Sequence, residues 1–252
     1  TNYYNGVKAR YLAEAGIQEA IARLREHVKS SAFDYEGEEW CAGATDAEWI
    51  SESAPVYTVT SNIATNETAT VEIVDEQRKI NINNASQQLL RWLLYNVSRH
   101  VCGDDPGNYG ELPGNAIPDA QEISNNSPYE TIEQLKQLDV FQENELFYDS
   151  FKEYVTVDSY RDRNSSYRSP VNINTAELWT LRSLFRYDYD DDDYDMIQWR
   201  INDLSEAIYD RVHDGGNPFT TWSDFKSFID TYDGGVSLFD NDVVEGVNSN
   251  FN

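Results

Sequence analysis

The chain of 252 residues is 40% hydrophobic and 13% aromatic, so it can bury a sizeable core and global disorder is excluded. Its 19 basic and 45 acidic side chains leave a formal net charge of −26. Such a surface repels phosphates and anionic lipid headgroups and attracts cations, divalent ones most strongly.

Residues 3–29 are predicted to form one long helix. Val7, Tyr11, Ile17 and Ile21 recur at helical spacing with charges between them, and no proline interrupts the stretch. Neither Thr1 nor Asn2 is followed at the third position by the acidic residue of an N-cap signal, which is typical of a helix whose natural upstream part is missing. An ordinary amphipathic core helix fits the same periodicity.

Three strands are expected next, at 56–60, 68–74 and 79–83. The first two are rich in β-branched residues and alternate apolar with polar positions, and a polar turn at 62–66 separates them. A long helix followed by an antiparallel meander is an α+β arrangement.

A short phrase, Asn-Ile-Asn, occurs twice, at 81–83 and at 172–174. Each copy ends a predicted strand, is followed by an Asn or Thr that can cap a helix, and leads into an apolar helix, at 86–101 and 178–185. The repetition indicates an internal duplication or two related modules.

The stretches around these copies are predicted from composition. Residues 102–128 contain Gly, Pro, Asn and Asp throughout and are expected to be a long irregular region. A short helix is predicted at 131–138 and a strand at 151–158. After the second copy we expect an acidic turn at 188–195, helices at 196–212 and 222–229, and the start of a strand at 243–247.

Catalysis and nucleic-acid binding are both disfavoured, and we expect no enzyme. His27, His100 and His213 lie in no metal-binding pattern, and no nucleophile-elbow, P-loop or dinucleotide fingerprint is present. The stretch from 172 to 225 resembles a helix-hairpin-helix module, which in DNA-binding members has a Gly-rich, basic hairpin. Here the hairpin at 187–195 has no glycine and carries six aspartates, which would repel a phosphate.

Calcium is the cofactor that the acidic loops predict, because clustered carboxylates repel each other unless a cation neutralises them and Ca²⁺ accepts irregular oxygen-rich loops. The 188–195 run does not match an EF-hand, and a solvated acidic turn is the alternative there. The candidate ligands in the two loops are Asp104, Asp105, Asn108, Glu111, Asp119, Glu122, Asp188, Asp190, Asp192, Asp193 and Asp195.

The order of these features resembles a known family. Residues 2–17 are similar to the part of pilin-like proteins that follows their hydrophobic N-terminal segment. The two Asn-Ile-Asn copies, together with 129–135, 154–157 and 211–225, resemble the K-type minor pseudopilin of bacterial type II secretion systems. Each motif is weak alone, and their order along nearly the whole chain carries the resemblance.

The resemblance implies a pilin-like long helix on an antiparallel sheet, with a large, mostly helical insertion that contains helix-hairpin-helix (SAM-like) parts. On this basis the chain divides into 1–83 (helix and first strands), 84–150 (first part of the insertion), 151–171 (returning strand), 172–235 (second part) and 236–252 (start of a C-terminal strand region that would continue beyond Asn252).

The resemblance also implies a function. A K-type minor pseudopilin caps the pseudopilus tip with the I-type and J-type minor pseudopilins and can bind calcium. The acidic hairpin adds the expectation that the chain does not bind nucleic acid. It is anchored in the inner membrane by a hydrophobic helix, here missing, and it faces the periplasm. The partner-binding residues would then lie on the N-terminal helix, at Tyr4, Val7, Tyr11, Ile17 and Ile21.

The two cysteines, Cys41 and Cys102, are compatible with separate buried thiols or with one disulfide, and the periplasmic location that the resemblance implies favours the disulfide. Two other functions stay open from the sequence. The first is a minor pilin of a type IV pilus with an adhesive or receptor-binding head, and the second is an acidic secreted hydrolase.

Overall fold

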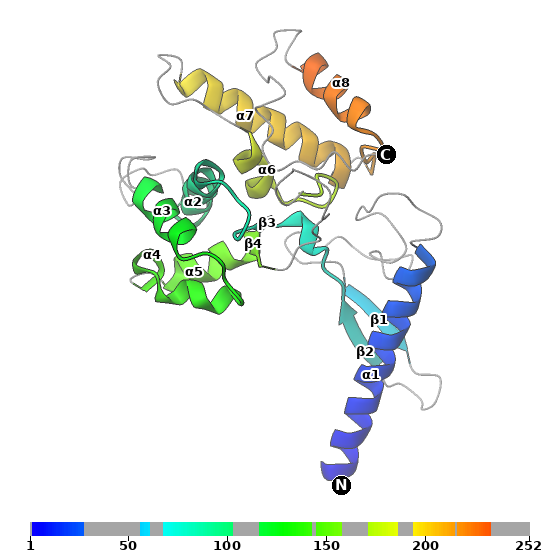
Figure 1. Cartoon of the computed structure of the whole chain (residues 1–252). Helices are drawn as coiled ribbons and strands as arrows, with labels where there is room; N and C mark the ends of the chain where they lie inside the picture. Colours follow the sequence, from blue (N-terminus) through cyan, green and yellow to red (C-terminus); the bar gives the residue numbers. More distant parts are fainter. Residues whose placement is uncertain are drawn as a thin grey trace. The chain divides into compact units, whose positions relative to one another are not determined.

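The computed structural model of the chain describes residues 2–27, 56–60, 68–102, 116–142, 145–157, 171–185, 194–214 and 216–232. It contains two compact units, Thr1–Asp75 and Glu76–Asn252, each with its own internal packing (Figure 1). The boundary lies within the predicted first segment, 1–83. No helix among the described residues is long and apolar enough to cross a membrane.

The first unit is a long helix with a strand pair beside it. Helix α1 (Asn2–His27) packs along β2 (Thr68–Glu72) and β1 (Val56–Thr60), which pair antiparallel with Val56 opposite Glu72. Two small residues one turn apart, Gly16 and Ala20, are buried on α1. Small residues at this spacing let another backbone approach the helix closely. The side of α1 that carries Gly16 and Ala20 is therefore the side that packs inward.

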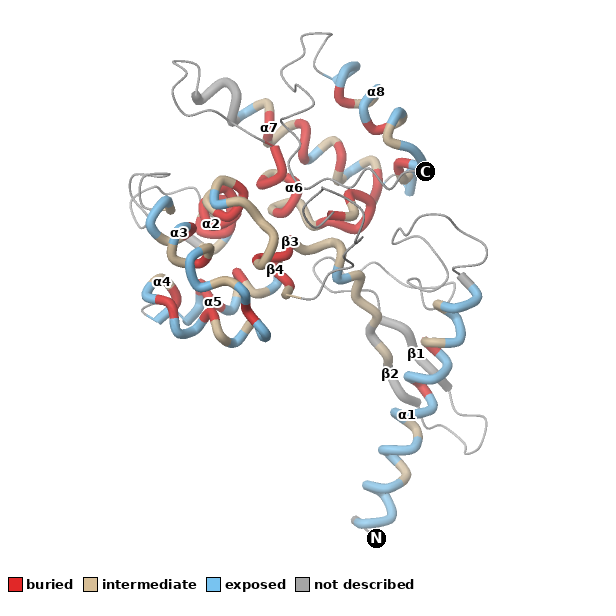
Figure 2. The backbone as a smooth tube through the Cα atoms, viewed as in Figure 1, coloured by how far each residue is buried: buried red, intermediate tan, exposed pale blue. Residues whose placement is uncertain are grey.

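The second unit is mostly helical, and α2 (Gln87–Cys102), which lies between α3 (Ala116–Asn125) and α6 (Leu178–Leu184), is mostly buried (Figure 2). Helix α2 is buried over almost its whole circumference, from Leu89 and Leu90 and then from Trp92 without interruption to Ser98. A helix that is buried all round must be covered on several sides. Helices α3, α5 (Glu145–Phe151) and α6 supply that cover.

The remaining elements of the second unit are short or lie toward its C-terminal part. Helix α7 continues into a π-helical turn, η4, and an irregular segment that contains Pro218 precedes α8. In chain order the elements not yet given are η1 (Glu76–Arg78), β3 (Ile80–Asn81), η2 (Ile132–Gln137), α4 (Asp139–Gln142), η3 (Lys152–Tyr154), β4 (Val155–Thr156), α7 (Tyr194–Tyr209), η4 (Asp210–Asp214) and α8 (Trp222–Tyr232).

The predicted third strand of a meander was wrong. Ile80 and Asn81 form β3, but β3 pairs in parallel with β4, with Ile80 opposite Val155 and Asn81 opposite Thr156. The Ile82 N–H extends the ladder by donating to the Thr156 carbonyl at 3.1 Å. Ile80 and Val155 are both 1% exposed, so burying them together selects this partner.

Two further predictions need correction. The expected irregular region 102–128 contains α3, with Ala120 and Ile123 buried; Pro118 is tolerated because it lies in the first turn. The expected strand at 151–158 shrinks to Val155–Thr156, and α5 extends to Phe151. Phe147 and Phe151 are buried one helical turn apart, and the rings of both lie against Phe141, the first stacked and the second tilted. This packing outweighs the local strand preference at Phe151.

The fold is therefore α+β in a loose sense, with helices predominating. A two-stranded antiparallel pair lies in the first unit and a two-stranded parallel pair in the second. Among the described residues no larger antiparallel sheet is present, and a pilin-like fold is not shown.

Candidate functional site

The first Asn-Ile-Asn copy forms a hydrogen-bonded junction between β3 and α2. The Asn81 Oδ1 accepts the Asn83 N–H at 2.8 Å, and the Asn81 carbonyl accepts the Ala85 N–H at 2.9 Å. These bonds turn the chain as asparagine side chains commonly do. The Ser86 Oγ then accepts the Leu89 N–H at 3.1 Å, so Ser86, rather than the predicted asparagine, caps α2.

The second asparagine of this copy clamps a distant backbone segment. The Asn83 Oδ1 accepts the N–H of Tyr129 at 2.7 Å, and its Nδ2 donates to the carbonyl of the same residue at 2.9 Å. One side-chain amide thus satisfies both polar groups of one backbone position. Only Asn or Gln offers a donor and an acceptor in this arrangement.

The second copy repeats the arrangement. The Asn172 Oδ1 accepts the Asn174 N–H at 3.1 Å. The Asn174 Oδ1 accepts the Phe219 N–H at 2.9 Å, and its Nδ2 donates to the Phe219 carbonyl at 3.0 Å. Asn174 is 0% exposed, so water does not replace these bonds. We call the Asn83–Tyr129 and Asn174–Phe219 pairs the two amide clamps.

The clamped segments are themselves alike, and this similarity was missed in the sequence analysis. One reads Ser-Pro-Tyr-Glu-Thr at 127–131 and the other Asn-Pro-Phe-Thr-Thr at 217–221. Both aromatic residues are buried, and each threonine stands at the start of a helix, with the Thr221 Oγ1 accepting the Asp224 N–H at 3.1 Å. The shared Pro-aromatic-x-Thr pattern, at nearly equal distance from each Asn-Ile-Asn, is the signal that could have revealed it.

The two clamps differ in what supports them. In the second, the Arg211 guanidinium lies 4.0 Å from the Phe219 ring centroid, donates to the Asn217 carbonyl at 3.1 Å, and pairs with Asp224 at 2.8 Å. In the first, the Tyr129 hydroxyl donates to the Ile123 carbonyl at 2.8 Å. Burial, and then the charge of Glu122, raises the pKa of Tyr129 to about 12, so it stays protonated and keeps donating.

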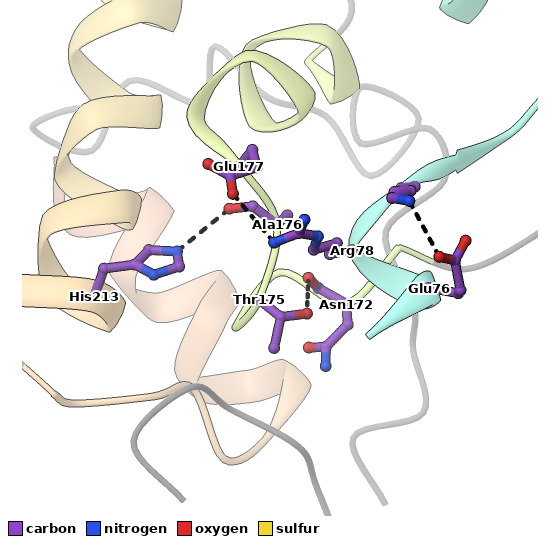
Figure 3. A network of polar contacts seen from close by, with 8 residues as sticks. Glu76, Arg78, Asn172, Thr175, Ala176, Glu177 and His213 are labelled. Carbon is purple, nitrogen blue, oxygen red and sulfur yellow. Dashed lines mark hydrogen bonds and ion pairs between the residues drawn. The ribbon is translucent and has the colours of Figure 1, made fainter. Parts of the chain in front are cut away.

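Polar contacts also join the two copies to each other (Figure 3). The Asn172 N–H donates to the Gln77 carbonyl at 2.8 Å, and Arg78 pairs with Glu177 at 3.3 Å. Between α2 and α6 the buried Asn96 Nδ2 donates to the Ser183 Oγ at 3.2 Å. These contacts fix the register of one copy against the other.

His213 approaches the second junction from η4. Its Nε2 lies 3.4 Å from the Ala176 carbonyl oxygen (Figure 3). Its ring stacks on Tyr209, with the ring centroids 4.0 Å apart. A ring held between a carbonyl and an aromatic face serves packing. In this network its Nε2 faces a backbone carbonyl, a contact that is compatible with an architectural role.

Only part of the predicted calcium set lies in the described residues. Asp119 and Glu122 are one turn apart on α3; burial, and then the charge of Glu122, raises the pKa of Asp119. The Glu122 Oε1 accepts the Asp139 N–H at 3.3 Å. Across the described ranges no three His, Cys, Asp or Glu side chains gather as a metal site would require.

The other predicted calcium ligands lie outside the description, so the calcium site stays a prediction. The side chain of Asp195, at the start of α7, is not described. The same is true of whole residues in both loops: Asp104, Asp105, Asn108, Glu111, Asp188, Asp190, Asp192 and Asp193.

The remaining predicted residues divide in the same way. Cys41 lies outside the described residues, and Cys102 ends α2 with its side chain undescribed, so the disulfide stays a prediction. On α1, Tyr4, Val7, Tyr11 and Ile17 are exposed, whereas Ile21 is half-buried.

Comparison with models of known protein families, with curated proteins and with solved structures returned no match.

Proposed function

We propose that this chain is a structural assembly protein, a K-type minor pseudopilin that caps the tip of a type II secretion pseudopilus. The observation that carries the proposal is the order of its parts. A long helix with exposed tyrosines and an adjoining strand pair come first, and a helical unit with two Asn-Ile-Asn junctions follows.

The chemistry of the junctions is compatible with an architectural role. The clamping groups are side-chain amides bonded to backbone groups, and an amide neither gains nor loses a proton near neutral pH. Among the described residues, these networks hold distant segments of the chain together, which is compatible with a role in assembly.

The family resemblance extends the proposal to location and partners. The chain would be anchored in the inner membrane before assembly and would face the periplasm, where Cys41 and Cys102 would form a disulfide and Ca²⁺ would bind the acidic loops. Its α1 helix would contact the I-type and J-type minor pseudopilins through Tyr4, Val7, Tyr11, Ile17 and Ile21.

Reconstitution with the two partners from the same genome tests this proposal. The three proteins should elute from size exclusion as one discrete heterotrimer. A Tyr4→Ala/Tyr11→Ala variant should weaken assembly about tenfold, because exposed aromatic residues often contribute most at interfaces. Leu146→Ala, which removes a residue that is 74% exposed on α5, is the matched control and should assemble normally. If neither partner binds the chain, the proposal is wrong.

A further inference from the structure

The outward face of α7 carries an exposed tryptophan. Ile201, Leu204 and Ile208 point into the core and are at most 2% exposed, whereas Trp199 is 63% exposed. At 100° per residue Trp199 lies on the side of the helix opposite Ile208. A large aromatic side chain left in water is a preferred anchor of protein interfaces, since covering it removes much apolar area at little entropic cost.

Three acidic residues share this side of the helix. Asp203 and Glu206 follow Trp199 on α7 by about one and two helical turns, and Asp210 comes about one turn later, as the first residue of η4. The three carboxylates and Trp199 therefore form one stripe. Glu206 pairs with Arg182, which itself lies over the Trp179 ring at 4.4 Å.

Tyr232, the last residue of α8, is 44% exposed. Burial, and then the charges of Asp203 and Glu206, raises the pKa of its phenol. Trp199, Asp203, Glu206 and Asp210 together are called the Trp199 surface.

Charge decides which class of partner fits. The net charge of −26 opposes a second copy of the chain, a nucleic acid or an anionic membrane. A lysine or arginine side chain can meet a carboxylate and an aromatic face at once, as Arg211 already does with Asp224 and Phe219. We propose that the Trp199 surface docks a lysine- and arginine-rich segment of another protein, with an apolar residue of that segment against Trp199.

The experiment uses the full chain and a labelled synthetic peptide of alternating lysine and leucine, with a twin in which glutamate replaces lysine. Fluorescence anisotropy should show that the chain binds the lysine peptide and does not bind its glutamate twin. Trp199→Ala should weaken binding about tenfold and Trp199→Phe should restore most of it. Asp203→Asn should weaken binding about threefold and reduce its dependence on salt. Leu146→Ala is the control, because it removes a similarly exposed apolar side chain outside the Trp199 surface, and it should bind the peptide like the wild type.

Several results would overturn the proposal. Equal binding of the basic peptide to the wild type and to Trp199→Ala would mean that net charge alone attracts the peptide. No binding at millimolar peptide would show that the Trp199 surface is not a docking site for basic segments. A Trp199-dependent change in oligomeric state would assign the surface to a second copy. Because Trp199 is exposed, its variants should keep the wild-type melting temperature. None of these outcomes depends on the pseudopilin proposal, since no other pseudopilin is present.

Discussion

At the scale of single residues, the two clamping asparagines, Asn83 and Asn174, each connect segments that are far apart in the chain. Each supplies one donor and one acceptor to a backbone position about 45 residues away, Tyr129 for Asn83 and Phe219 for Asn174. Aspartate could supply only acceptors when ionised, and a hydrophobic residue could supply neither. Since a buried backbone group without a partner costs about 1–3 kcal/mol, the asparagine identity is fixed by the bonds it makes.

Asn174→Ala should therefore lower the free energy of unfolding by about 2–4 kcal/mol, because it leaves both the N–H and the carbonyl of Phe219 without their partner. Asn83→Ala should lower the free energy of unfolding by a smaller amount, since Asn83 is only partly buried and water can replace some of its hydrogen bonds. Urea denaturation followed by circular dichroism measures both.

Asn125→Ala, at an exposed position on α3, is the control for the clamp variants and should change stability by less than about 0.5 kcal/mol. A similarly small loss for Asn174→Ala would show that the clamp contributes little to stability.

At the scale of elements, α2 organises the second unit. It contacts α3, α5 and α6, and its buried Asn96 hydrogen-bonds to Ser183 on α6. This buried polar pair disfavours sliding of one helix along the other, because a shift would break the hydrogen bond between them and leave each group only its bond within its own helix. The helix thus joins the two Asn-Ile-Asn copies into one packed body.

Truncating the centre of α2 should be far more damaging than truncating an exposed helix. Leu90 is 0% exposed, so Leu90→Ala should destabilise the chain by about 3–5 kcal/mol through lost burial and the cavity left behind. Leu146→Ala on α5 makes the same chemical change at a 74% exposed site and should cost less than about 0.5 kcal/mol. Comparable losses in the two variants, measured by thermal unfolding, would contradict the central role of α2.

At the scale of the whole molecule, the excess of acidic residues is the dominant property. Self-repulsion among these charges opposes the compact state, and a bound divalent cation would relieve it locally. The proposed calcium sites therefore connect the charge of the chain to its stability.

Adding Ca²⁺ at millimolar concentration should raise the melting temperature, and a chelator should reverse the rise, because a ligand that binds only the folded state stabilises it. Mg²⁺ at equal concentration is the control for general screening of the negative charges. It should raise the melting temperature less than Ca²⁺ does, since Mg²⁺ fits irregular multi-carboxylate loops poorly. Asp119→Asn/Glu122→Gln tests whether α3 contributes ligands. An unchanged melting temperature with Ca²⁺ would count against both acidic loops.

The local sequence was sufficient to predict the positions of most helices and of the two Asn-Ile-Asn turns, because these depend on residues that are close together in the chain. Helical spacing placed α2, α6, α7 and α8 within a few residues of their positions, and the turn-forming asparagines marked the two junctions. Each of these elements depends on side chains within a turn or two of one another, so their pattern can be seen in a short window.

Only the tertiary structure decided which distant segments meet. A strand as short as Ile80–Asn81 has too few side chains to specify its partner, and burial of Ile80 against Val155 selected a parallel pairing over the expected meander. The amide clamps likewise join residues far apart in the chain. Local composition determined where this chain turns and coils. Long-range burial and hydrogen bonding determined which segments those turns hold together, because such pairing depends on residues that a short window of sequence does not contain.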